Sequence, residues 1–205
     1  MATPLPTSRE ELELLIQQTV DKRVAERLGE VQSTLAQLQG MVARSAAHVP
    51  EDRATLVVFS GEMDTLQSAC NIAAGAVAMG MEVSLFFTFW GLTALRRSTT
   101  YSGKSVGQRM AAFMLPSGPA SVPTSRMNMA GMGPLFFKHL MQQKNVLSLP
   151  EMITLLRQLG VRLVACEMSM GVMGITREEL LPDIDYGGVA TYLGDASRSK
   201  ITLFI

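Results

Sequence analysis

Two cysteines are the side chains most able to do chemistry in this sequence. Cys166 directly follows residues 162–165 (RLVA), an apolar run typical of a short buried strand, and precedes residues that can form a helical turn. Free backbone N–H groups and the helix dipole favour a thiolate at such a position. A thiolate attacks sulfane sulfur and can hold it as a persulfide. Position alone leaves a buried structural cysteine as an equal alternative.

Cys70 has a different setting, within an apolar segment beside Ala69, Ile72 and Ala73. That is the usual environment of an inert core cysteine. A resolving role in a disulfide with Cys166 stays open, and it requires Cα atoms within about 7 Å of each other. Two cysteines in 205 residues make no disulfide framework, and no secretory signal is recognisable. We therefore expect a reducing, cytoplasmic compartment.

Other reactive groups are sparse. His48 and His139 lie far from each other and from both cysteines, so we predict neither a metal site nor a cofactor. The 15 methionines include a group on both sides of the expected site. Core packing explains most methionines, whereas a soft pocket wall or copper binding by thioethers are the alternatives.

The elements that would position Cys166 alternate between strands and helices. Strands are expected at residues 55–59, 82–89, 162–165 and 201–205, which are short runs rich in β-branched and aromatic residues. Helices are expected between them, for example from Asp64 or Thr65 through Cys70 to Gly80. This alternation predicts an α/β fold with a small, doubly wound, mainly parallel sheet and helices on both faces.

Open parallel sheets bind ligands at the carboxyl ends of their strands. Ser60 and Gly61 follow the first expected strand, Trp90 and Gly91 follow the second, and Cys166 follows the third. We therefore expect these residues to form one pocket. The further lining residues that we expect are Met129, Met132, Met168, Ser169 and Met170.

The charges are balanced overall but not locally. The chain has 18 basic and 18 acidic residues, so its composition does not suggest nucleic-acid binding. Residues 83–150 contain no Asp or Glu, and their basic residues are Arg96, Arg97, Lys104, Arg109, Arg126, Lys138 and Lys144. This stretch could steer an anionic substrate or an acidic partner, or it could be a solvated basic loop. Much of it, residues 98–133, is predicted to be irregular.

Residues 69–95 are apolar enough to raise the question of a membrane span. Glu82 lies in the middle of this segment and would be costly in lipid. A buried helix followed by a buried strand explains the pattern better, so we predict no membrane span.

The first fifty residues follow a different pattern. Ser8 and Glu11 form a capping-box start, and an apolar seam spaced alternately by four and three follows. The seam consists of Val24, Leu28, Val31, Leu35, Leu38 and Val42. Such a heptad pattern predicts a coiled coil, so residues 1–50 are interpreted as a helical oligomerisation segment. The alternative is an amphipathic helix folded back on its own domain, which would occupy residues 51–205.

Several motifs in the second segment resemble the DsrE/DsrF/DsrH-like family, in the branch that is also fused to rhodanese and CoA-disulfide-reductase domains. The motifs are FFTFWGL (86–92), MNMAGMG (127–133), ACEMSM (165–170), VMGI (172–175) and GGVA (187–190). The resemblance covers residues 55–205. It implies a small doubly wound domain that assembles as a homo-oligomer: a dimer, trimer or hexamer.

The activity that the resemblance implies is sulfur carriage. The family's cysteine falls on Cys166, which would pass sulfane sulfur to a TusA-like or rhodanese-like partner, whereas Cys70 has no counterpart. Relatives often carry Asp where this chain has Gly171. Because some family members lack activity, a non-catalytic scaffold or regulatory subunit of a sulfur-trafficking complex is the alternative.

Overall fold

The computed structural model describes residues 9–46, 50–126 and 132–205, and the chain forms two compact units, residues 1–49 and 50–205. The described part of the first unit is one long helix, α1 (Arg9–Ala46). Its large apolar side chains between Leu14 and Val42 are 46 to 66% exposed. The heptad seam is therefore a continuous, unburied apolar stripe on a single helix.

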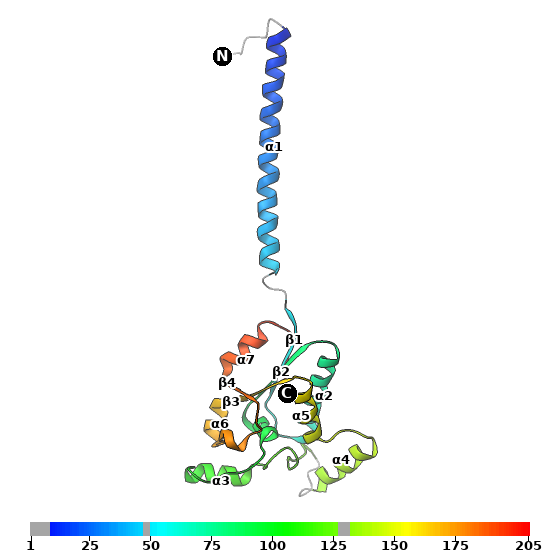
Figure 1. The fold of residues 1–205 in the computed structure, drawn as a ribbon, viewed down its shortest axis with the longest axis vertical. Helices are drawn as coiled ribbons and strands as arrows, with labels where there is room; N and C mark the ends of the chain where they lie inside the picture. Colours follow the sequence, from blue (N-terminus) through cyan, green and yellow to red (C-terminus); the bar gives the residue numbers. More distant parts are fainter. Residues whose placement is uncertain (1–8, 47–49, 127–131) are drawn as a thin grey trace. The chain divides into compact units, whose positions relative to one another are not determined.

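The second unit is built around a five-stranded sheet (Figure 1). The strands are β1 (Glu51–Val58), β2 (Glu82–Phe87), β3 (Arg162–Cys166), β4 (Asp185–Gly187) and β5 (Ser199–Phe204). Their order is β4-β3-β2-β1-β5, and every neighbouring pair is parallel. The predicted α/β class with a parallel sheet is thus confirmed. Because all strands run the same way, their carboxyl ends meet at one edge.

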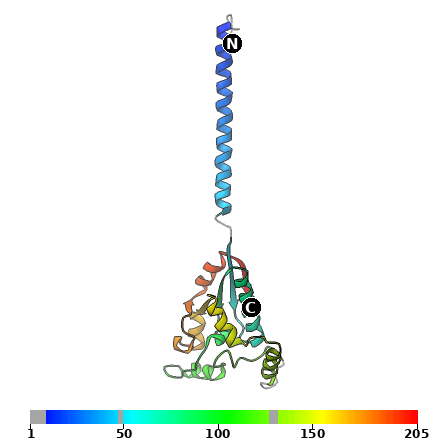
Figure 2. The same ribbon diagram turned by 45° about the vertical axis from the view of Figure 1, so that its right-hand side comes forward.

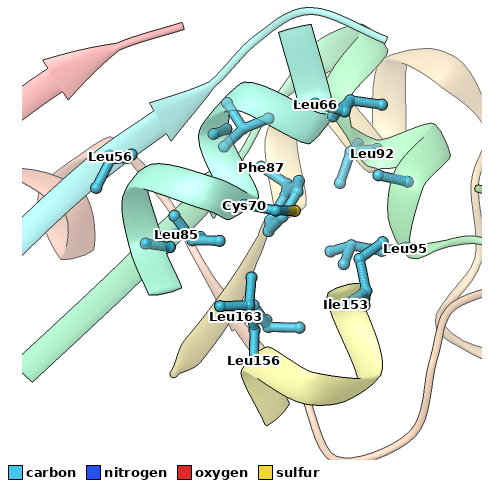
Figure 3. Close-up of a cluster of buried hydrophobic side chains, with 14 of the residues drawn as sticks. Leu56, Leu66, Cys70, Leu85, Phe87, Leu92, Leu95, Ile153, Leu156 and Leu163 are labelled. Carbon is cyan, nitrogen blue, oxygen red and sulfur yellow. The ribbon is translucent and has the colours of Figure 1, made fainter. Parts of the chain in front are cut away.

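One face of the sheet carries the main core. Alternate residues such as Leu56, Leu85 and Leu163 pack there against α2 (Met63–Ala78) and α5 (Leu149–Gln158). Figure 3 shows Cys70 within this cluster, surrounded by labelled leucine and phenylalanine side chains. The apolar segment around Cys70 is therefore a buried helix, as predicted. Among the described residues, no helix combines the length and apolar character needed to cross a bilayer.

The opposite face of the sheet is covered more thinly. Phe86, Val164 and Cys166 form a small separate apolar cluster there, and Tyr192 of α7 (Val189–Ala196) packs against it. The rings of Phe86 and Tyr192 have centroids 5.7 Å apart. Because side chains alternate along a strand, Cys166 and its neighbour Ala165 belong to different faces.

The remaining described elements lie in the connections. They are η1 (Phe89–Leu95), α3 (Val106–Met114), α4 (Met132–Gln143), α6 (Glu167–Met173) and η3 (Arg177–Glu179). Part of the segment predicted to be irregular is thus helical, because Ser105 and Gln108 form a capping box that starts α3. Figures 1 and 2 both place α3 and α4 beyond the carboxyl ends of the strands.

A buried ion cluster fastens these connections to each other. Glu179 is fully buried and receives Arg96 Nη2 at 3.4 Å and Lys104 Nζ at 2.6 Å. The backbone amides of Thr100 and Thr176 also donate to its carboxylate, at 2.7 and 2.9 Å. Two cations of the basic stretch are therefore internal structural groups and contribute little to its surface.

Candidate thiol site

Cys166 is the last residue of β3 and the residue that caps α6. It pairs with Gly187 of β4, and its side chain is 1% exposed. The sequence folds this way because an apolar strand is followed directly by a helix-forming segment, without an intervening loop. The thiol consequently lies at the carboxyl edge of the sheet but beneath its surface.

The environment of Cys166 favours the thiolate. Burial on its own would raise the pKa of the thiol. Hydrogen bonds from the side chain and amide of Ser169, the hydroxyl of Thr88 and the amide of Met168 outweigh burial and lower the pKa of Cys166 below its ordinary value. A thiol with these donors can ionise more readily than a free cysteine, and the thiolate is the reactive form.

Thr88 is a site residue that the sequence analysis missed. Phe87 pairs with Ala165, which puts Thr88 at the level of Cys166 one step further along. The hydroxyl oxygens of Thr88 and Ser169 lie 2.8 Å apart, and both residues are buried. The alternation of Phe86 and Thr88 on one face of the strand was the only available signal for this role.

Glu167, which would oppose a thiolate beside it, has its own partner. Arg177 Nη2 lies 2.6 Å from a carboxylate oxygen of Glu167. The Arg177 guanidinium also lies 4.4 Å from the centroid of the Tyr186 ring. The negative charge of Glu167 is therefore held at the surface, next to the cation of Arg177.

Cys70 lies in a different environment from Cys166. Burial raises the pKa of its thiol to about 12, so it stays protonated at neutral pH. Both cysteines are free, and they belong to apolar clusters on opposite faces of the sheet. A disulfide between them would require one side chain to cross the sheet.

Three of the expected pocket residues, Ser60, Gly61 and Trp90, line one cavity of about 510 Å³. The other residues that line it are Phe59, Glu62, Thr93, Leu115, Pro116 and Pro123. Cys166 is not among these lining residues. The cavity thus belongs to the ends of β1 and β2.

Gly61 and Gly91 allow the segments that follow β1 and β2 to lie close together. A Cβ atom at Gly61 would meet the Trp90 carbonyl oxygen at 2.7 Å, and one at Gly91 would collide with the Val58 carbonyl. Phe89, two residues before Gly91 in the chain, has a left-handed backbone with φ of 45°. For a residue other than glycine this conformation is strained, as is common at functional sites.

The predicted methionine wall is dispersed. Met132 and Met168 are exposed, whereas Met170 is buried in the main core on the other face from Cys166. Met129 lies outside the described residues. Ser169, in contrast, contacts the thiol as expected. Within the described ranges, no group of three or more His, Cys, Asp or Glu side chains is gathered as a metal ion would require.

A parallel doubly wound sheet with a hydrogen-bonded cysteine at its carboxyl edge defines a class of small α/β thiol proteins. The family model described as "DsrE/DsrF/DrsH-like family" matches residues 50–204. The chain therefore belongs to this family, and the resemblance seen in the motifs is confirmed.

Two relatives cover nearly the same segment. The "Uncharacterized protein YrkE" of Bacillus subtilis (strain 168) is 46% identical over 154 residues, which are 75% of this chain and 96% of that protein. The "Sulfur carrier protein DsrE2" of Allochromatium vinosum is 26% identical over 159 residues, 76% of this chain and 99% of that protein. The similarity to the second relative thus extends over the whole α/β domain.

Among solved structures, the chain is similar to the ychN protein of E. coli. The match has a TM-score of 0.44 at 12% identity and covers 75% of this chain and 99% of that one.

Proposed function

We propose that this protein is a sulfur carrier that holds sulfane sulfur as a persulfide on Cys166. The observation that carries the proposal is the set of hydrogen bonds from Ser169, Thr88 and Met168, which lowers the pKa of a cysteine at the carboxyl edge of the sheet. The relation to a protein named as a sulfur carrier supports the same function.

The reaction needs no external oxidant. The Cys166 thiolate attacks the outer sulfur of a persulfide donor R–S–SH, a new S–S bond forms, and R–S⁻ leaves. In the second step an acceptor thiolate attacks the outer sulfur of the Cys166 persulfide and regenerates the Cys166 thiolate. Each step breaks one S–S bond and forms one, so electrons and atoms balance. We infer that the acceptor is a TusA-like or rhodanese-like protein and that the exchange takes place in the reducing cytoplasm.

We further propose that the protein is a homo-oligomer assembled through α1. Leu28, Leu35 and Val42 occupy one core position of the heptad, and Val24, Val31 and Leu38 occupy the other. In the heptad of Leu28 and Val31, leucine at the first position and a β-branched residue at the second favour assemblies larger than a dimer. Of the residues that flank this core, Gln32, Thr34 and Gln39 are uncharged, and Arg27 pairs with Glu30 of its own helix. This favours an identical helix as the partner over one selected by charge.

The alternative function is an oligomeric scaffold without chemistry of its own. The 1% exposure of Cys166 is the observation that favours it, because a reactive thiol must meet its donor. The two candidates differ in one measurable property, the capacity of Cys166 to accept sulfur.

The deciding experiment is intact-protein mass spectrometry after incubation with polysulfide, followed by reductant. We expect wild type and Cys70→Ser to gain whole sulfur atoms that reductant removes, and Cys166→Ser to gain none. Equal loading of the two single variants would sink the assignment of Cys166. Absence of loading in wild type with any donor would favour the scaffold.

A further inference from the structure

The exposed cations of the α/β domain fall into two groups. Outside residues 83–150, each of its Lys and Arg residues forms an ion pair with a carboxylate. These residues are Arg53, Arg157, Arg162, Arg177, Arg198 and Lys200. Among the described residues of the range 83–150, only the buried Arg96 and Lys104 do so.

The remaining cations of that stretch have no acidic partner. In the described part of the chain, the other five cations of this stretch lie within ion-pair distance of no carboxylate: Arg97, Arg109, Arg126, Lys138 and Lys144. The Arg97, Arg109 and Lys138 side chains donate to backbone carbonyl oxygens instead. The charge of these cations is therefore not neutralised by a carboxylate of the described residues.

Unpartnered apolar side chains accompany these cations. On α3, Val106, Met110, Phe113 and Met114 are 66 to 86% exposed, and on α4, Leu135 and Phe136 are 68% and 55% exposed. We call these six residues, together with Arg97, Arg109, Lys138 and Lys144, the carboxyl-edge surface. Both helices lie beyond the carboxyl ends of the strands in both ribbon views (Figures 1 and 2).

We propose that the carboxyl-edge surface docks on an anionic phospholipid membrane. Short helices with protruding Phe, Leu and Met side chains and flanking cations bind in the interfacial plane of a bilayer, where the cations meet phosphate groups. No membrane-crossing helix is found among the described residues, so the contact is peripheral.

A second copy of the chain fits this surface less well. Residues 83–150 supply no carboxylate, so a symmetric contact between two such surfaces would bring cations together without compensation. A folded acidic protein would need a groove for each protruding side chain, whereas a lipid interface accepts such side chains without a preformed shape.

The test uses the full chain and vesicles of phosphatidylcholine, with or without about a third phosphatidylglycerol, in co-sedimentation. We expect binding to the anionic vesicles at low salt, weaker binding at high salt, and little binding to the neutral vesicles. Replacing two cations, Arg109→Ala with Lys144→Ala, should weaken binding about thirtyfold. The matched control, Arg157→Ala with Lys200→Ala, removes the same charge elsewhere and should have a much smaller effect.

A second variant pair tests the apolar contribution. Phe113→Ser with Leu135→Ser should abolish sedimentation with anionic vesicles. Met79→Ser with Leu159→Ser, which removes exposed apolar side chains at the ends of α2 and α5, should not. Circular dichroism verifies that all variants are folded.

Two outcomes would overturn the proposal: no binding of wild type to anionic vesicles at low salt, or equal binding to neutral and anionic vesicles. A third outcome would identify a second copy of the chain as the partner of this surface. In that case wild type would not bind vesicles, and Phe113→Ser with Leu135→Ser would lower the mass measured by light scattering. The result is independent of sulfur chemistry, because Cys166→Ser should bind vesicles as wild type does.

Discussion

The hydroxyl oxygens of Thr88 and Ser169 lie 2.8 Å apart, beside the thiol of Cys166. Thr88 comes from the end of β2 and Ser169 from the first turn of α6, so the thiol receives hydrogen bonds from two elements that follow different strands. The pair links the orientation of α6 to the central strand of the sheet.

Removing these hydroxyls should therefore raise the pKa of Cys166. Ser169→Ala should have a larger effect than Thr88→Val, because the Ser169 side chain is the stronger of the two contributions. The thiolate fraction can be followed by ultraviolet absorbance against pH, with Cys166→Ser as the baseline. Thr154→Val on the exposed side of α5 is the control. Unchanged titration in both site variants would contradict the assigned donors.

Glu179→Gln should lower the free energy of unfolding by about 3–5 kcal/mol, because Arg96 and Lys104 would remain buried without a counter-charge. Chemical denaturation measures this change. The control is Glu178→Gln, an exposed neighbour for which a change of about 0.5 kcal/mol or less is expected. Similar losses in the two variants would show that burial of the ion cluster is not the cause.

The same cluster should make the free energy of unfolding depend on pH. Burial acts to raise the pKa of Glu179, but hydrogen bonds from Lys104, Thr176 and Thr100, with the attraction of Lys104, lower the pKa below its ordinary value. A carboxyl with a lowered folded pKa contributes stability above its unfolded pKa and loses it as pH falls through the folded value. The stability difference between wild type and Glu179→Gln should accordingly shrink on acidification. A difference that is constant with pH would contradict this linkage.

Charging the seam of α1 should dissociate the oligomer. Leu28→Lys with Leu35→Lys places two charges in the apolar stripe, whereas Ser33→Lys with Gln37→Lys adds the same charge on the other side of the helix. We expect light scattering to give fewer chains per particle for Leu28→Lys with Leu35→Lys and for a chain lacking residues 1–48, but not for Ser33→Lys with Gln37→Lys. An unchanged number of chains per particle after truncation would refute assembly through α1.

Gly91→Ala should destabilise the domain by about 1–3 kcal/mol, because its Cβ would collide with the Val58 carbonyl. Gly171→Ala has open space around its Cβ and a helical backbone, so it should be neutral or stabilising by up to about 1 kcal/mol. Thermal unfolding distinguishes the two. Equal melting temperatures would show that the end of β1 and the segment after β2 can move apart without loss of stability.

The fold could be read from the sequence where strands are apolar and buried. The runs that form β1, β2 and β3 meet this condition. The edge strand β5 is largely exposed and was predicted from its β-branched and aromatic composition alone. The three-residue strand β4, with the sequence Asp-Tyr-Gly, has no such pattern, because its place depends on pairing with β3. Helix α3 escaped prediction since its nine residues stand in a Gly- and Ser-rich stretch and depend on one capping box.

The site was predicted in part for a similar reason. Cys166 and Ser169 are close in sequence, so their contact follows from one helical turn. Thr88 is 78 residues away from Cys166 in sequence, and only the β2–β3 register brings it to the thiol. The methionines could not be assigned, because Met168 and Met170 differ in burial only through the direction in which α6 turns.

The enclosure of Cys166 beneath Phe86, Val164 and Tyr192 affects the fate of its cargo. A persulfide in this position would be shielded from the small thiols that strip sulfur from exposed cysteines. Exchange would then depend on displacement of the short helix α7 or of the first turn of α6. A docked protein would speed this displacement, whereas small diffusing thiols would react only slowly, when the site opens on its own. In such a carrier, the protein that can displace these helices determines where the sulfur is delivered. The thiol itself then needs no selectivity between acceptors.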